Sequence, residues 1–438
     1  MGTKVNDSQR QAFLHLVRSG RTVSQASQEV GRARSWGYKW KARYEQEGWA
    51  GVKERSRAPH HVSRKTPEAV RQEILRVRSV LEAEAQASDK LGYIGGAAIY
   101  ARLPSRRGQP LPSVSTIERI LRQAGMTKPR PLKVDKEAVQ YPHLKPTSAH
   151  QLTQVDIVPH YLTGGESIAC FNSIDVVSRY PAGTQFKRKR STEAADFLVH
   201  TWRELGLSPY LQMDNESCFS GGYKHPGVIG KVVRLALSVG VQPVFSPFYH
   251  PESNGSIERF HQDYSAFVWK KAHLENLAAV RQRSALFFPN YRHSRHHSAL
   301  GGKSPLELHV ATPRRSLPVG FSIPDKLPIT AGQVHFIRAV DQHRQVLILN
   351  KTWSAGLGVP DQGVWATLFL TPNGATLRIY DAAPDTPKRR CLAVHPFPLK
   401  EPVVPLPAPF SSPGPAHPWW QVVLNVFKRP RLAPSTMS

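Results

Sequence analysis

The sequence predicts a multidomain protein: an all-α N-terminal third with helix-turn-helix units, a central mixed α/β domain and a small C-terminal β-barrel. Its 438 residues amount to roughly three domains of typical size. Apolar residues follow helical spacing up to residue 126 and strand-like alternation in much of the remainder. The formal net charge of +27 favours a polyanionic partner such as DNA, although charge alone also fits a ribosome-associated or membrane-skimming protein.

Cysteine spacing and apolar patterns exclude several classes of protein. Cys170, Cys218 and Cys391 are too far apart to form CxxC pairs, so we expect neither a disulfide framework nor a structural zinc site. The sequence contains no apolar run long enough to span a membrane, and no apolar segment follows the first charge at the N-terminus. We therefore expect a soluble protein in a reducing, intracellular compartment.

Residues 1–50 predict a helix-turn-helix. Phe13 marks the apolar face of a first helix, and Thr22 with Gln25 has the capping-box spacing that opens a second. Gly31 supplies a turn before a third helix that buries Trp40. A small helical bundle with merely solvated basic side chains is the alternative. The basic residues on and beside the third helix that we expect to contact DNA are Arg32, Arg34, Lys39, Lys41 and Arg43.

Residues 66–126 predict a second, helix-turn-helix-like unit, which a basic linker (51–65) separates from the first. Ser115 and Glu118 repeat the capping-box spacing at its last helix. Arg119 and Arg122 point away from the apolar stripe of that helix, so they are candidate DNA contacts. A solvated helical bundle remains the alternative here too. Further candidates in the first linker are Arg55 and Arg57, and a second linker covers residues 127–148.

Residues 149–312 predict a mixed α/β domain, because three strands in series are followed by alternating helices and strands. Three acidic residues lie in apolar surroundings there. Asp156 is on the first strand, Asp214 ends a later strand, and Glu258 is in the first turns of a helix that starts near residue 254. If the strands are neighbours and the helix packs across them, the three carboxylates form an all-oxygen site suited to Mg²⁺ or Mn²⁺.

Several motifs in this region resemble the DDE transposases of bacterial insertion sequences, which have a catalytic core of the retroviral-integrase type. Residues 214–219 (DNESCF) resemble the family's D-N-G-x-x-F block. Residues 246–261 (SPFYHPESNGSIERFH) resemble its S-P-x-x-P-x-x-N-G-x-x-E-R block. Residues 175–180 (DVVSRY) and 291–305, which include HSALGG, resemble two further segments. The likeness spans most of residues 8–310 and implies an RNase H-like integrase core over residues 149–312.

The resemblance implies a function and its participants. Asp156, Asp214 and Glu258 would be the catalytic residues and the ligands of two Mg²⁺ or Mn²⁺ ions. The protein would bind the terminal inverted repeats of its mobile element, cut the 3′ ends and join them to target DNA. It would act as a homo-oligomer on double-stranded DNA in the bacterial cytoplasm, associated with the nucleoid and not with a membrane. The further DNA contacts that we expect are Asn254, Arg259, Arg292 and Arg295.

Two departures from the family's pattern and two alternative functions remain. Glu216 stands where the family usually has Gly, and Ser256 stands where it often has a Lys that can contact the transposon end. Asp175 is as strand-like as Asp156, but its Ser-Arg-Tyr context fits an ion pair or a turn. The alternative functions are a domesticated or regulatory DNA-binding relative, and a metal-dependent nuclease that does not join strands.

The C-terminal third predicts a small β-barrel over residues 325–400, because four segments alternate apolar and polar residues. Arg338, Lys351 and Arg378 are candidate DNA contacts on it, and a purely structural or multimer-forming barrel is equally compatible. Residues 401–438 are Pro-rich, which predicts an extended tail.

Overall fold

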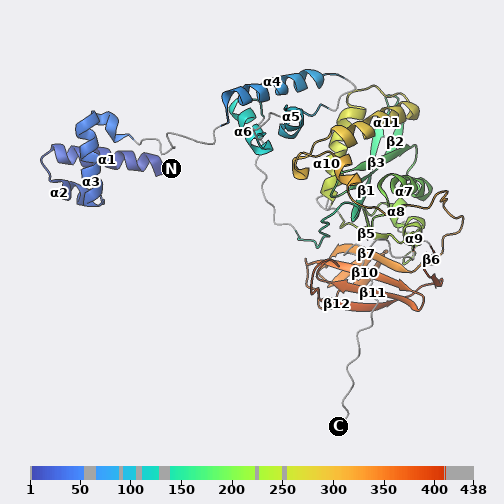
Figure 1. Ribbon diagram of the computed structural model, residues 1–438. Coiled ribbons are helices and arrows are strands. Elements are labelled where there is room, and N and C mark those ends of the chain that lie inside the picture. Colours follow the sequence, from blue (N-terminus) through green and yellow to red (C-terminus); the bar gives the residue numbers. More distant parts are fainter. Residues whose placement is uncertain are drawn as a thin grey trace, which may run out of the picture. The chain divides into compact units, whose positions relative to one another are not determined.

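The computed structural model divides the chain into two compact units, Met1–Pro67 and Glu68–Ser438 (Figure 1). No helix in its described part is long and apolar enough to cross a membrane. The expected DNA contacts Arg55 and Arg57 lie outside the described residues, as does most of the expected Pro-rich tail. The structure describes residues 2–53, 66–87, 92–104, 111–127, 139–221, 226–248, 254–408 and 410.

The N-terminal unit is a three-helix helix-turn-helix, as the sequence predicts. Its core joins Phe13, Ala26 and Trp40, one from each helix. The capping box of Thr22 and Gln25 is present at the start of the second helix. These elements are α1 (Gly2–Arg18), α2 (Val23–Glu29), α3 (Arg34–Glu47) and the 3₁₀ turn η1 (Gly48–Val52).

The second unit begins with three helices, α4 (Glu68–Glu84), α5 (Gly96–Arg102) and α6 (Val114–Gln123). They share a core of their own that includes Ile74, Ile99 and Ile117. The predicted capping box at Ser115 is wrong, since Ser113 caps α6 by accepting a hydrogen bond from the Thr116 N–H. Glu118 instead accepts a hydrogen bond from the Gly96 N–H at 2.7 Å, which ties α6 to the start of α5.

A nine-stranded mixed sheet forms the centre of the second unit. Its order is β12-β11-β10-β7-β5-β4-β1-β2-β3. β1, β2 and β3 are antiparallel neighbours, whereas β4 and β5 run parallel to β1. The first five strands are β1 (Leu152–Tyr161), β2 (Ser167–Asp175), β3 (Pro181–Phe186), β4 (Tyr210–Met213) and β5 (Gln242–Phe245).

Helices cover both faces of these strands, with α10 and α11 on one side and α7 to α9 on the other (Figure 1). Alternate residues of β2 show the two faces: Phe171 packs with the α7 and α9 side chains, and Cys170 packs with those of α10 and α11. The helical elements are α7 (Ser191–Leu205), α8 (Ser217–Ser220), α9 (Lys231–Ser238), α10 (Gly255–Tyr264), the π-helical turn η3 (Ser265–Trp269), α11 (Leu277–Ser294), η4 (Ser298–Leu300) and α12 (Pro305–Val310).

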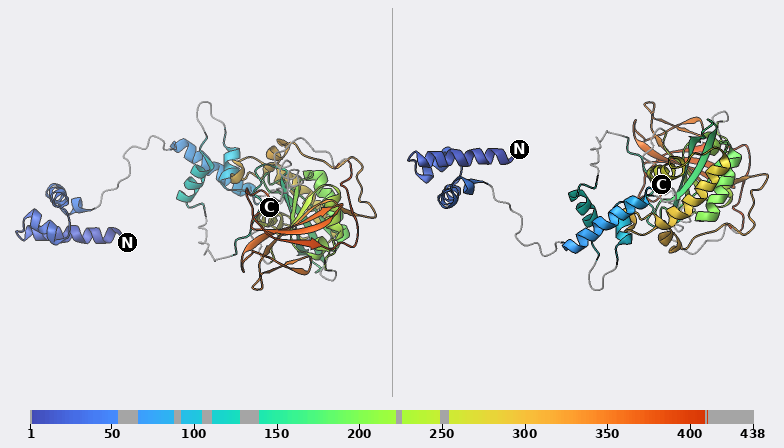
Figure 2. Two further views of the ribbon diagram at one scale, coloured as in Figure 1. Left: turned by 90° about the horizontal axis from the view of Figure 1, so that it is seen from below. Right: turned by 90° about the horizontal axis from the view of Figure 1, so that it is seen from above.

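The C-terminal strands do not close into the predicted small β-barrel. Four of them, β7, β10, β11 and β12, extend the central sheet, because β7 pairs in parallel with β5, with Val244 opposite His335 and Phe245 opposite Phe336. The other four form two separate two-stranded sheets, β6 with β13 and β8 with β9. Pairing with β7 protects the hydrogen-bonding edge that β5 would otherwise expose. Figure 2 shows these orange strands as an open sheet. The C-terminal strands are β6 (Ile329–Thr330), β7 (Gly332–Ala339), β8 (Gln345–Ile348), β9 (Lys351–Ser354), β10 (Gly363–Thr371), β11 (Gly374–Tyr380), β12 (Cys391–Phe397) and β13 (Val403–Val404).

Candidate active site

The register of β1 and β4 sets Asp156 and Asp214 at corresponding positions. Gln154 lies opposite Gln212 in this parallel pair, and each aspartate follows its glutamine by two residues. Val155 belongs to the core under α7 and α9. Because neighbouring residues of a strand point to opposite faces, Asp156 points to the side of α10 and α11.

Glu258 reaches the same region from the first turn of α10, which packs against β1 and β2. Burial is the main cause that raises the pKa of Asp156 to about 7, and the negative charges of Asp214 and Glu258 raise it further. Burial also raises the pKa of Asp214 to about 6, with a contribution from Glu216. Asp156 is therefore near enough to be repelled by both of the other carboxylates.

The donor chemistry of this carboxylate cluster (Asp156, Asp214 and Glu258) fits a hard divalent cation. Within the described ranges, no group of three or more His, Cys, Asp or Glu side chains is arranged to hold a metal ion. The side chains nevertheless offer oxygen ligands only, and their mutual repulsion would be relieved by a cation. Burial is the main reason that the pKa values of both aspartates are raised, and the positive charge of Lys189 offsets only part of it at Asp214.

Two further side chains beside the cluster were not expected from the sequence. His261 Nδ1 lies 3.6 Å from Asp156 Oδ2, and burial lowers the pKa of His261 to about 4, so the imidazole is neutral at pH 7. Lys189 forms an ion pair with Glu216 at 2.9 Å, and this contact raises the pKa of Lys189. The spacing of three residues between Glu258 and His261 on one helix face is a signal that could have identified His261.

A buried network of hydrogen bonds links the segments that carry the cluster. Gln212 Nε2 donates to Ser246 Oγ and to Asn254 Oδ1, both at 3.1 Å. Ser246 Oγ donates to Asn254 Oδ1 at 2.9 Å, and Gln154 Oε1 accepts a hydrogen bond from the Ile257 N–H at 3.3 Å. The network joins β1, β4 and the loop after β5 to the start of α10, so it places the turn that carries Glu258.

Two family models match parts of the chain. Residues 239–305 match the family model described as "Integrase core domain", and residues 10–72 match the one described as "Winged helix-turn helix". Residues 239–305 are therefore similar to part of an integrase core domain. These matches confirm the resemblance that the motifs indicated and support an integrase-type function that involves DNA binding. The matched core segment contains Glu258 but neither Asp156 nor Asp214.

Solved structures of viral integrases resemble the chain at low identity. The simian T-cell lymphotropic virus intasome in complex with the PP2A regulatory subunit B56 gamma is 16% identical, covering 75% of this chain and 99% of that chain, with a TM-score of 0.34. The catalytic core domain of HTLV-2 integrase in complex with magnesium, in its trimeric form, is 14% identical. The match covers 38% of this chain and 99% of that chain, with a TM-score of 0.30. The core of BIV integrase is 19% identical over 37% and 95%, with a TM-score of 0.29.

The structure accommodates both departures from the pattern of the DDE transposases. Glu216 has a φ of −51° at the start of α8, which any L-residue can adopt, so the turn does not require Gly. Its N–H donates to Asp214 Oδ1 at 3.1 Å. Ser256 Oγ accepts a hydrogen bond from Arg179 Nη1. Asp175 caps the turn after β2, where Ser178 N–H and Oγ donate to its Oδ1 at 2.6 and 2.8 Å, as its context indicates.

The structure separates the expected DNA contacts into exposed and internal groups. Asn254 is 8% exposed and belongs to the buried network. Arg292 donates to the Pro181 carbonyl at 2.9 Å and pairs with Glu204. We leave these two out of the proposed DNA surface, together with Arg295, which pairs with Asp263 at 3.1 Å. The exposed members are Arg32, Arg34, Lys39, Arg119, Arg122 and Arg259, and the half-buried ones are Lys41 and Arg43.

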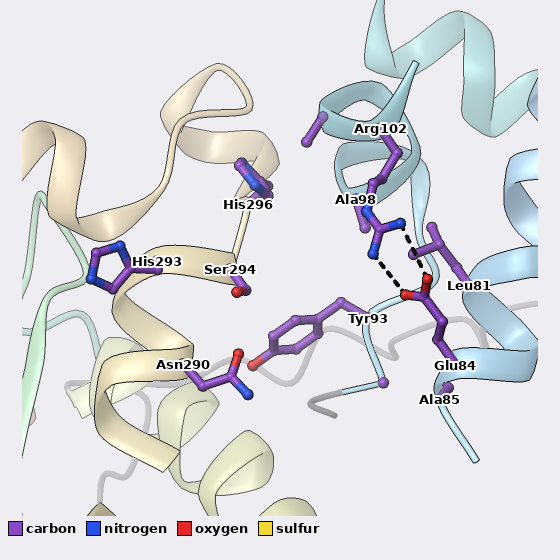
Figure 3. A pocket seen from close by; sticks show the side chains of 12 residues that line it. Leu81, Glu84, Ala85, Tyr93, Ala98, Arg102, Asn290, His293, Ser294 and His296 are labelled. Atoms are coloured by element: carbon purple, nitrogen blue, oxygen red, sulfur yellow. Dashed lines mark hydrogen bonds and ion pairs between the residues drawn. The ribbon is translucent and has the colours of Figure 1, made fainter. Parts of the chain in front are cut away.

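A cavity of about 270 Å³ lies away from the carboxylate cluster. Figure 3 shows it between the ends of α4 and α5 on one side and α11 on the other. Arg102 and Glu84 pair across its wall at 2.7 Å, and His293 and His296 line the opposite side. None of the three carboxylates is among the described residues that line it.

Proposed function

We propose that this protein is a DDE transposase that binds the terminal inverted repeats of its mobile element, cuts their 3′ ends with Mg²⁺ and joins them to target DNA. The proposal is supported by the strand register, in which Asp156 and Asp214 each follow the paired residues Gln154 and Gln212 by two positions, and by the charges of Asp214 and Glu258, which raise the pKa of Asp156. The helix-turn-helix and integrase-core matches support it.

The three carboxylates would bind the metal ions, with Asp156 and Asp214 as shared ligands and Glu258 as a ligand of the second ion. Two bound divalent ions supply activation of the attacking oxygen and stabilisation of the leaving 3′ oxygen. No side chain has to act as a nucleophile, since water and then the exposed 3′-hydroxyl attack in turn. His261 Nδ1 lies 3.6 Å from Asp156 Oδ2, and its imidazole is neutral at pH 7, so it adds no positive charge that would compete with a bound cation.

The exposed basic side chains of the N-terminal unit would bind the element ends. α3 is the third helix of the helix-turn-helix and carries Arg34 and Lys39, both exposed. A helix in this position enters the major groove, so its exposed side chains reach bases and flanking phosphates. We expect a homo-oligomer on DNA, because cutting and joining two element ends needs two active sites.

The test replaces Glu258 by Gln, which keeps the size of the side chain and removes its charge. We expect Glu258→Gln to bind DNA carrying the terminal repeats with unchanged affinity and to lose both cleavage and strand joining. Glu166→Gln is the matched control, because Glu166 is an exposed loop residue that pairs with Lys187 at 2.9 Å. This control should retain both reactions.

Three results would contradict the proposal in distinct ways. An equal loss of DNA binding in Glu258→Gln would make Glu258 a structural residue. Cleavage without joining by the unmodified protein would leave a metal-dependent nuclease. Binding to the repeats without cleavage, at any Mg²⁺ or Mn²⁺ concentration, would leave a DNA-binding relative that has lost the reaction.

A further inference from the structure

A buried arginine from the C-terminal part of the sheet bonds the residue that follows Asp214. Arg338 is on β7 and is 4% exposed. Its Nη2 donates to Asn215 Oδ1 at 2.8 Å, and its Nη1 donates to the Ser246 carbonyl at 2.9 Å. The remaining bonds of the guanidinium go to the carbonyls of Ile337 at 2.7 Å and Leu347 at 2.9 Å. Arg338 is thus not the exposed DNA contact that its place in the sequence suggests.

The acceptors in these bonds are all neutral oxygens, which is unusual for a buried cation. Burying a charged group is costly unless a counter-charge or several well-placed dipoles compensate. Arg338 also lies over the rings of Phe248 and Phe336, at 4.4 and 5.4 Å from their centroids. Burial lowers its pKa to about 9, so the side chain keeps its charge at neutral pH. A methionine would fill the space at a lower desolvation cost, so packing alone does not account for an arginine here.

Two of these bonds reach the turn that follows Asp214 and the loop after β5. Asn215 directly follows Asp214, and its Nδ2 donates to the Ser246 carbonyl at 2.8 Å. Ser246 in turn donates to Asn254, the residue before α10 and its Glu258. One guanidinium therefore joins the turn after β4 to the loop after β5, and through the buried network to the start of α10.

We propose that Arg338 is a positioning residue, whose guanidinium fixes the turn of Asp214 relative to the helix of Glu258 so that their carboxylates can share metal ions. The proposal rests on the proposed function. It makes the C-terminal sheet a part of the active site, because the strand that covers the edge of β5 also delivers this arginine.

The test uses the full chain and three variants. Arg338→Met removes the hydrogen bonds and keeps much of the volume, and Arg338→Lys keeps the charge. Asn215→Ala removes one acceptor of Arg338 together with the bond from Asn215 to the Ser246 carbonyl, while leaving Arg338 in place. The control is Arg344→Met, because Arg344 is exposed in the turn that precedes β8. The measurements are Mn²⁺ binding by electron paramagnetic resonance, affinity for repeat DNA, the single-turnover cleavage rate, and the melting temperature.

We expect Arg338→Met to weaken Mn²⁺ binding and slow cleavage by about 10- to 100-fold, as typical for groups that orient metal ligands. DNA affinity should stay unchanged. Asn215→Ala should show the same pattern, and the double variant should be no worse than the poorer single one, because both act through one contact. Arg338→Lys should recover part of the Mn²⁺ affinity, and Arg344→Met should behave as the unmodified protein.

The outcomes separate this inference from the proposed function. If the unmodified protein neither binds Mn²⁺ nor cleaves, the proposed function fails. If it does both and Asn215→Ala retains full Mn²⁺ affinity and rate, the positioning role fails, even where Arg338→Met is too unstable to measure. Additive effects in the double variant, or a parallel loss of DNA affinity, would also overturn it by making Arg338 a general stabiliser of the fold.

Discussion

Replacing Asp156 by Asn should stabilise the metal-free protein while abolishing its activity. The pKa of Asp156 is raised from 3.8 to about 7, and a difference of about 3 at 1.36 kcal/mol each gives an upper limit of about 4 kcal/mol for the cost of its charge. Part of this cost is the repulsion between Asp156 and Asp214, whose ionisations are coupled. We therefore expect the free energy of unfolding to rise by about 2 kcal/mol. Asparagine keeps the shape and the Oδ1 that accepts the Ile157 N–H at 2.8 Å.

The gain depends on pH with a definite sign. The folded-state pKa of Asp156 lies above its unfolded value, so the charge destabilises the folded state fully above pH 7 and not at all below about pH 4. The assay is thermal and urea unfolding of the full chain in EDTA at pH 8 and pH 4, followed by a probe in the second unit. A variant that is less stable at pH 8, or a gain that is equal at both pH values, would refute the reasoning.

Three other predictions follow from the site, the N-terminal unit and the core. Both aspartates of the cluster must ionise to bind Mn²⁺, and their pKa values are about 7 and 6. Mn²⁺ affinity measured by calorimetry should therefore be about 20-fold weaker at pH 6 than at pH 8. Equal affinities would contradict this. Replacing Arg34 and Lys39 together by Ala should weaken binding to repeat DNA and lower the slope of log affinity against log salt by about 1.8, whereas an unchanged slope would remove them from the DNA surface. Gly183→Ala should lower the free energy of unfolding, measured in urea, by about 1–3 kcal/mol. The added Cβ would lie 2.5 Å from Asn172 Oδ1 and 2.6 Å from Phe288 Cζ. An unchanged stability would show that both neighbours can move.

The elements of the central domain were predictable because their apolar pattern is local. The three strands expected in series at the start of this domain are β1 over 152–161, β2 over 167–175 and β3 over 181–186. Strand alternation also contained an unused signal: Gln154 and Gln212 each precede an aspartate of the cluster by two residues, so they lie on the same face and carry the network beneath it.

The roles of individual polar side chains were less predictable, because the same residue type can lie at the surface or form hydrogen bonds and ion pairs in the interior. Arg292 and Arg295 lie in a motif with several basic residues and were expected to face DNA, yet they bind Glu204 and Asp263 within the protein. Ser115 has the spacing of a cap, but Ser113 performs that role because α6 begins earlier. Sequence spacing alone carries no information on which carboxylates and carbonyls lie nearby in space.

By itself the sequence determined the basic helix-turn-helix, the order of strands and helices in the core, and the three acidic residues in their motifs, since propensity, periodicity and residue type act over short distances. Only the tertiary structure decided that the C-terminal strands continue the central sheet and bring Arg338 to Asn215. The physical reason is that an alternating strand bears the same pattern whether it closes a barrel or covers the free edge of β5. That choice is made by pairing between segments that lie about ninety residues apart, as Phe245 and Phe336 do.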